Sequence, residues 1–210
     1  MSAHRHPAMR SRVVAEELQG GTTVQMITAP TETTLITGEE LLAMGDIGPC
    51  ELIDGRIVPM SPTGGRHGVV ESRLGSALSF FVQQHNLGWV LTGEVGIYIW
   101  RNPDRVRGAD IVFLSRERWP EGPSEGFLEG APDLVVEIMS PNDRWQEVRQ
   151  KIAEYFSIGV RWVWIIEPEN YAVLTFRSST DFQPFGAEDM LAGEGPLEGF
   201  TLPVASLFTA

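Results

Sequence analysis

Two short, nearly all-apolar runs near the middle of the chain each carry one carboxylate. Residues 133–140 have Glu137 in their second half, and residues 107–114 have Asp110 at the start of their apolar part. Runs of this length favour strands that are buried on both faces of a sheet. An ionised carboxylate on such a strand costs free energy unless it is paired or binds a metal ion. The structural alternatives are that Glu137 faces solvent or an arginine at a strand end, and that Asp110 caps a turn.

The rest of the pattern predicts a small set of helices and strands. Apolar positions at helical spacing predict helices over residues 66–85 and 143–157. A threonine in N-cap position followed by acids in the first turn predicts a short helix over residues 37–44. Strand patterns predict a hairpin over residues 51–60, with Asp54-Gly55 at its turn, and strands over residues 89–92, 96–100, 110–114, 133–140, 162–166 and 172–177. This order of elements predicts an α/β (α+β) fold with a mixed central β-sheet flanked by helices.

The two ends of the chain differ from this middle part. Residues 1–35 show no clear period and contain Gly, Thr and Pro clusters, so we expect an N-terminal extension that is peripheral or flexible. We expect residues 36–210 to form a single domain, with the segment 199–204 packed back on its core.

Composition limits the class of protein. The chain has 210 residues, of which 42% are hydrophobic, and this suits one domain with a sizeable core. Cys50 is the only cysteine, so no internal disulfide can form and a reducing, cytoplasmic setting is the simplest expectation. We expect no membrane span, because no window approaches about 18 consecutive apolar residues. We also expect no secretory signal, because no apolar segment follows the basic N-terminus.

The charge balance restricts the partners. A formal net charge of −12 argues against a protein that coats nucleic acid non-specifically. It does not exclude a nuclease, because a cleft can be locally basic and a bound metal ion brings positive charge. Lys151 is the only lysine, and many of the arginines lie between residues 101 and 161.

The carboxylates suggest a metal site. Acids on two adjacent strands can converge on one hard cation, and oxygen ligands suit Mg²⁺ or Mn²⁺. Asp133 precedes Glu137 by four residues, which on a strand separates them by about 13 Å, so Asp110 is the better partner for Glu137. Lys151 borders the apolar stripe of helix 143–157, where its ammonium needs an acid, a phosphate or a metal-bound water. The alternative is a lysine whose stem covers apolar surface while its charge reaches solvent.

Several motifs occur together in a specific order. They are ELIDG at residues 51–55, MSP at 60–62, HG at 67–68, GADIVFLS at 108–115, GAPDLVVEIMSP at 130–141, KIAEY at 151–155 and GVRWVWIIEP at 159–168. With this set the chain resembles the Uma-type family of predicted restriction endonucleases, part of the PD-(D/E)XK nuclease superfamily. The likeness covers residues 37–208, and it implies a restriction-endonuclease-like PD-(D/E)XK core.

The resemblance implies roles for the central acids and the lysine. Asp110 matches the PD aspartate and Glu137 matches the (D/E) position. Met139 stands where the superfamily pattern has its lysine, and Lys151 on the next helix matches the lysine of this family. Ala109 replaces the usual proline before the aspartate, which is a minor departure because proline does no chemistry.

Two further residues and the ligands follow from the same resemblance. Glu51 matches an acid that completes a metal shell with Asp110 and Glu137, and His67 matches a histidine near the site. The implied activity is hydrolysis of phosphodiester bonds in DNA by an endonuclease that uses Mg²⁺ or Mn²⁺. Cutting of both strands would favour a homodimer that presents one site to each strand.

Other hypotheses remain open at this point. The strong acidity and the displaced lysine fit a catalytically silent nuclease fold that binds DNA or protein. A hydrolase of another phosphate ester or of a nucleotide would use the same chemistry. His67 and Glu71, four residues apart on a helix, form an alternative metal pair.

Overall fold

The computed structural model describes residues 34–209. The extension predicted over residues 1–35 lies outside the described residues, apart from its last two positions. The helices are α1 Gly38–Ala43, α2 Gly65–Gln84, α3 Trp145–Ser157 and α4 Ala205–Phe208, with a short 3-10 helix at Gly195–Leu197. The strands are β1 Cys50–Ile53, β2 Arg56–Pro59, β3 Gly88–Trp100, β4 Arg105–Ser115, β5 Leu134–Ile138, β6 Trp162–Glu167, β7 Ala172–Phe176, β8 Phe182–Phe185, β9 Met190–Ala192 and β10 Thr201–Pro203.

The core of the fold is a mixed eight-stranded sheet. Its order is β2-β1-β4-β5-β6-β7-β8, and β3 pairs with β4. The pair β5–β6 is parallel and the other pairs are antiparallel. A parallel pair needs a crossover connection, and α3 supplies it between β5 and β6. The predicted fold class, a mixed sheet flanked by helices, is therefore confirmed.

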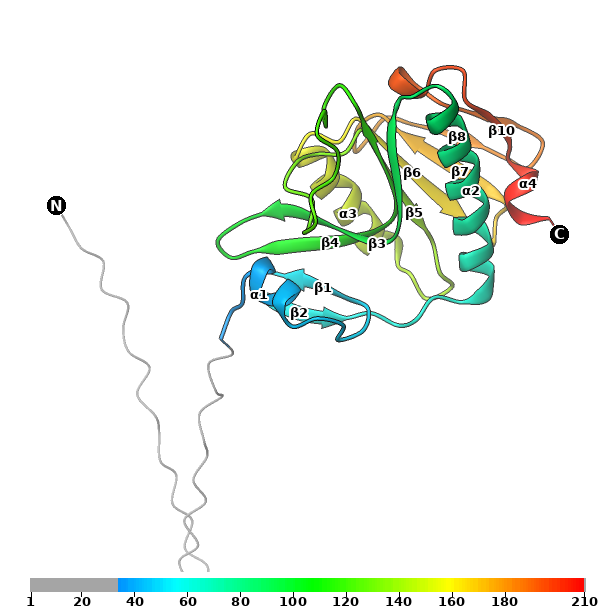
Figure 1. Cartoon of the computed structure of the whole chain (residues 1–210). Coiled ribbons are helices and arrows are strands. Elements are labelled where there is room, and N and C mark those ends of the chain that lie inside the picture. The colour runs from blue at the N-terminus through cyan, green and yellow to red at the C-terminus, as the bar shows by residue number, and fades with distance from the viewer. Residues whose placement is uncertain (1–33, 210) are drawn as a thin grey trace, which may run out of the picture. The chain divides into compact units, whose positions relative to one another are not determined.

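The two long helices cover opposite faces of this sheet (Figure 1). On one face, α2 buries Val70, Leu74 and Leu78 in a cluster that includes Phe113 of β4. Their spacing of four residues places them on one side of the helix, where each contributes roughly 1.5–3 kcal/mol by burial.

On the other face, α3 buries an apolar stripe of its own. Val148, Ile152 and Tyr155 pack in a cluster with Val112 of β4 and Val135 of β5. Successive side chains along β4 and β5 point to opposite faces of the sheet and pack in two different cores. This explains why both strands are nearly all apolar.

The predicted hairpin over residues 51–60 is present as β1 and β2. Asp54 and Gly55 form its turn with φ values of 51° and 74°, the left-handed conformation that a two-residue hairpin turn requires. The short helix predicted after Thr37 is also present, and Thr37 and Glu40 form a reciprocal capping box at its start.

The strand prediction was wrong between residues 89 and 110. Residues 89–92 and 96–100 belong to one long strand, β3, which carries a bulge between Thr92 and Val95. Gly93 and Glu94 form this bulge with φ values of 88° and 59°. An extra residue interrupts the two-residue period of a strand, so the pattern looks like two separate strands.

The C-terminal part contains elements that the sequence pattern did not predict, namely β8, β9, β10 and α4. The expectation that residues 199–204 return to the core is confirmed, because Phe200 and Val204 are buried in the α2-side cluster. Within residues 34–209, none of the helices combines the length and apolarity needed to cross a bilayer.

Candidate functional site

A change of strand partner creates the centre of the site. On one edge, β4 pairs with β1 at Val106 and with β5 from Ile111 onward. Residues 107–110 therefore lie at a fork, where β4 has left β1 and has not yet joined β5. Side chains from β1, α2 and α3 contact these residues. We call residues 107–110, the side chains that contact them, and Glu137 with its hydrogen-bond partners the fork site.

Asp110 occupies the end of the fork and is almost fully buried, with 5% of its surface exposed. The backbone N–H of Ile138 on β5 donates to its Oδ2 atom (2.6 Å), and Nε2 of His67 on α2 lies 3.2 Å from its Oδ1 atom. Burial lowers the pKa of His67, but the hydrogen bond to Asp110 and the nearby carboxylates outweigh burial and raise it overall. Asp110 thus links helix α2 to strand β5.

Glu137 lies on β5, and the β4–β5 register places it opposite Asp110. Its carboxylate accepts hydrogen bonds from the Lys151 ammonium (3.0 Å to Oε2) and from the Tyr155 hydroxyl. Burial raises the pKa of Glu137 to about 7, the Asp110 charge acts in the same direction, and Lys151 opposes both. Glu137 is therefore a carboxylate whose proton affinity lies near neutral pH.

Lys151 reaches the fork from α3, as its position beside the apolar stripe predicted. Its Nζ atom lies 3.0 Å from Oε2 of Glu137, 3.1 Å from Oε1 of Glu51 and 3.5 Å from the carbonyl oxygen of Gly108. Burial lowers the pKa of Lys151, but Glu137 and Glu51 outweigh this and raise it, so the side chain stays an ammonium. This ammonium joins the buried carboxylate of Glu51 and the partly buried carboxylate of Glu137, which would otherwise repel each other.

Glu51 enters the same site from β1, whereas Asp54 does not. Glu51 accepts from Nη1 of Arg107 (2.6 Å) and from the backbone N–H of Gly108 (3.2 Å). Asp54, in the hairpin turn, pairs instead with Nη2 of Arg105 (2.8 Å). The structure thus brings together all five residues selected from the sequence, Asp110, Glu137, Lys151, Glu51 and His67, and their functional roles stay predictions.

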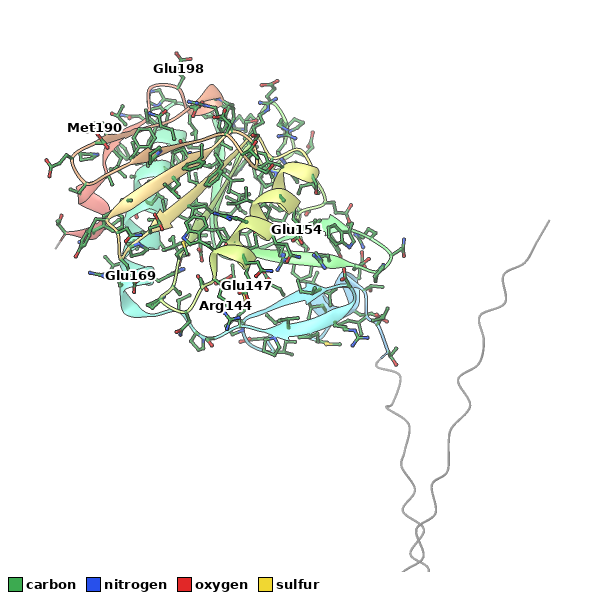
Figure 2. The ribbon with its side chains drawn as sticks, turned by 180° about the vertical axis from the view of Figure 1, so that it is seen from behind. Arg144, Glu147, Glu154, Glu169, Met190 and Glu198 are labelled. Atoms are coloured by element: carbon green, nitrogen blue, oxygen red, sulfur yellow. The ribbon has the colours of Figure 1, made fainter. Side chains whose placement is uncertain are left out.

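Behind Glu51, a buried ion network ties α3 to β4. Glu154 of α3 accepts from Nε of Arg107 (2.6 Å) and also pairs with Arg105. Figure 2 labels Glu154 on α3, on the side of the helix that borders β3 and β4. Because each charge has an opposite neighbour, this network holds Glu51 and α3 in place at a tolerable desolvation cost.

One group in the described part of the chain has metal-ligand spacing. His67, Glu71 and Asp110 each offer one ligand atom, and these atoms all lie within 4.8 Å of one another. Within residues 34–209, the predicted ligand set of Asp110, Glu137 and Glu51 does not have this spacing. The Lys151 ammonium lies between its two glutamates. The two sets share Asp110, so the metal assignment from the sequence stays a prediction.

The surroundings of His67 fit a bound cation. The side chain is 6% exposed, and its Nδ1 atom has no hydrogen-bond partner. That atom lies 3.9 Å from Oε2 of Glu71, which is too long for a hydrogen bond. An unpaired buried nitrogen beside two carboxylates is a donor set that a divalent ion can satisfy.

Sequence reasoning missed three residues of the fork site. Tyr155 was assigned only to the apolar stripe of α3, yet its hydroxyl bonds Glu137. Arg107 was counted only among the clustered arginines, yet it holds Glu51. Glu94 was placed between two strands, where the break in the two-residue period after Thr92 was the signal that could have revealed it.

Comparison with known proteins identifies relatives. The model of the Uma2 family, described as "Putative restriction endonuclease", matches residues 39–205. A crystal structure described as "a putative nuclease belonging to DUF820", from Anabaena variabilis, superposes with a TM-score of 0.70 at 22% sequence identity. This match covers 82% of the present chain and 97% of the other. The search of curated proteins found no match.

Proposed function

The chain belongs to the Uma2 family, and from this membership and the fork site we propose that it is a divalent-metal-dependent endonuclease that hydrolyses phosphodiester bonds of DNA. The observation that most supports the proposal is the position of Asp110. Its carboxylate contacts His67 of α2 on one side and the backbone of β5 beside Glu137 on the other. It therefore belongs to both groups of side chains from which a hydrolytic metal site could be built.

The proposed ion is Mg²⁺ or Mn²⁺ bound at Asp110. His67 and Glu71 complete the group with ligand spacing, and Glu137 and Glu51 are the ligands predicted from the sequence. When bound, such an ion neutralises the charge of the phosphodiester and lowers the pKa of its water. The carboxylates suit both ions, whereas an imidazole is not a ligand that Mg²⁺ favours, so we expect Mn²⁺ to bind more tightly.

Lys151 is the proposed electrostatic partner of the reaction. Its side chain is partly buried, its ammonium lies beside Gly108 and two glutamates, and the raised pKa keeps it charged at neutral pH. A fixed positive charge stabilises the negative charge that develops on the phosphate in the transition state. Met139, at the usual position of the lysine, is only partly buried and makes no polar contact with the site in residues 34–209.

Incubation of plasmid DNA with the protein tests the proposal directly. We expect cleavage with Mn²⁺ or Mg²⁺ and none after addition of EDTA. Asp110→Asn, purified in parallel, should be inactive, and this control separates the protein's own activity from a contaminating nuclease. Parallel assays with RNA and with simple phosphate esters define the substrate class. Failure of the parent protein to cut any of these substrates would favour the silent nuclease fold instead.

A further inference from the structure

The bulge in β3 lies directly opposite Asp110. Thr92 pairs with Ile111 and Val95 pairs with Ala109, so Gly93 and Glu94 together face the single residue Asp110. Bulges are frequent beside active sites, because the extra residue turns a side chain away from its regular direction. This arrangement makes Glu94 the natural candidate for a side chain that the bulge directs toward Asp110.

Glu94 holds a backbone conformation that its residue type disfavours. Its φ of 59° lies in the left-handed region, where a side chain larger than hydrogen costs free energy. Such conformations persist where the surrounding structure imposes them, and they cluster at functional sites. Here the β3–β4 ladder on both sides of the bulge imposes it.

The carboxylate of Glu94 lies over Gly108. A Cβ atom built at Gly108 would come within 2.9 Å of Oε2 of Glu94, so the absence of a side chain there makes room for this acid. Gly108 and Asp110 are two residues apart on β4 and therefore share one face of the sheet. The carbonyl oxygen of Gly108 also lies 3.5 Å from the Lys151 ammonium. Glu94 is thus part of the fork site.

Glu94 differs from the other acids of the site in its contacts. Glu51 and Glu137 are paired with Lys151, and Asp110 is bonded to His67. Glu71 accepts a hydrogen bond from the backbone N–H of Gly93 in the bulge itself (3.0 Å). For Glu94, by contrast, no hydrogen bond or ion pair is found within residues 34–209.

We propose that Glu94 is a further acidic group of the metal centre and strengthens the binding of the divalent ion at Asp110. The inference rests on one part of the proposed function, namely that a divalent ion binds at Asp110. It does not require that the protein cleaves DNA. Glu94 lies outside the group with ligand spacing, so we assign it a hydrogen bond to a water molecule on the ion. The Nδ1 atom of His67 lies beside Glu71 and has no hydrogen-bond partner. This independent observation indicates that a ligand binds here.

The electrostatic surroundings of Glu94 support this assignment. Burial raises the pKa of Glu94, and the charge of Asp110 raises it further, while Lys151 and His67 act in the opposite direction. A cation bound nearby would stabilise the ionised form of Glu94, which burial and Asp110 both disfavour. Residues that hydrogen-bond around a metal ion typically change its affinity about 10-fold to 100-fold when they are mutated.

Calorimetric titration of the full-length chain with Mn²⁺ tests the inference without any need for cleavage. We expect Glu94→Gln, which keeps the shape and removes the charge, to weaken Mn²⁺ binding by about 10-fold or more. Glu121→Gln is the matched control, because it removes the same charge from an exposed residue and should leave the affinity unchanged. Gly108→Ala should weaken binding as well, since its Cβ would displace the Glu94 carboxylate.

The outcomes separate this inference from the proposed function. Glu94→Gln with the affinity of the parent overturns the inference and leaves the nuclease proposal standing. If the parent protein binds Mn²⁺ more tightly than Glu94→Gln but cuts no substrate, the inference stands and the nuclease proposal is wrong. A parent that binds no divalent ion overturns the inference. Thermal unfolding of each variant shows whether a lower affinity reflects the loss of folded protein.

Discussion

Two acids at the two ends of β5, one fully buried and one partly buried, have opposite surroundings. Asp133, just before the strand, is completely buried, accepts from the backbone N–H of Ser115 (2.8 Å) and pairs with Arg161 (3.2 Å). Glu137, near the other end, accepts a hydrogen bond from the Tyr155 hydroxyl, and the one positive charge beside it is an ammonium that it shares with a second glutamate. Asp133 therefore sits among donors and positive charge, whereas Glu137 sits among other acids.

These surroundings suit different roles in the protein. An acid surrounded by donors and arginines stabilises the fold, and at Asp133 it joins the start of β5 to β4 and to the segment before β6. An acid among acids lowers stability unless a cation is added, and natural proteins keep such arrangements where the cation has a function. Sequence spacing excluded Asp133 as a metal partner of Glu137, and the structure shows the separate role that Asp133 has.

We expect the strongest effect from substitution of Lys151, whose ammonium lies between the carboxylates of Glu51 and Glu137. Lys151→Ala should reduce the rate of DNA cleavage by roughly 10²-fold or more, the scale of a lost acid–base or charge-stabilising group. Lys151→Arg should restore the charge but only part of the rate, because a planar guanidinium does not replace a compact ammonium. Single-turnover rates, corrected for the folded fraction from circular dichroism, measure this. Cleavage at the parental rate by the alanine variant would contradict the catalytic assignment.

The next effect compares the same substitution in the two surroundings. Asp133→Asn should lower the free energy of unfolding by about 2 kcal/mol, because it removes a charged partner from a fully buried hydrogen-bond network. In a chain of this size that corresponds to about 4–8 °C in Tm. Asp110→Asn should lower Tm less, because the weaker hydrogen bonds to His67 and the Ile138 N–H are offset by the removal of one negative charge from an acid-rich site. Calorimetric unfolding of both variants without metal checks the contrast, and an equal loss in both would refute it.

The smallest effect is the pH dependence that Glu137 contributes to stability. Its pKa in the folded chain is about 7, against 4.5 for an ordinary glutamate. Between these values the folded chain holds more protons than the unfolded chain, so the free energy of unfolding falls as pH rises. The stabilising contribution is therefore complete below about pH 4.5 and is lost as pH passes through about 7.

Glu137→Gln isolates this contribution. In the variant, the free energy of unfolding should fall less steeply between about pH 4.5 and 7. The difference in slope should correspond to the binding of at most one proton. Denaturant unfolding at several pH values measures the slope, and a parallel series with Asp133→Asn serves as the control. A slope in Glu137→Gln that equals that of the parent would show that other groups cause the decline.

Local sequence signals were enough to predict most helices and strands and several residues of the candidate site. The apolar period placed Val70, Leu74 and Leu78 on one face of α2, and Asp54-Gly55 specified the hairpin turn, because both signals depend only on neighbouring residues. The same local reasoning placed Asp110 and Glu137 on core strands. It also predicted that Lys151 lies beside the apolar stripe of α3, which faces the sheet.

The set of groups that meet at the fork site depends on long-range contacts, which local sequence signals do not reveal. The change of partner of β4 from β1 to β5, the pairing of Arg107 with Glu154, and the opposition of Glu94 to Asp110 all join residues far apart in the chain. A bulge shifts the side-chain direction by one residue, and its position depends on the partner strand rather than on the local sequence. For that reason the sequence could identify acids on separate strands, whereas the structure alone shows which of them have partners and that Glu94 has none within residues 34–209.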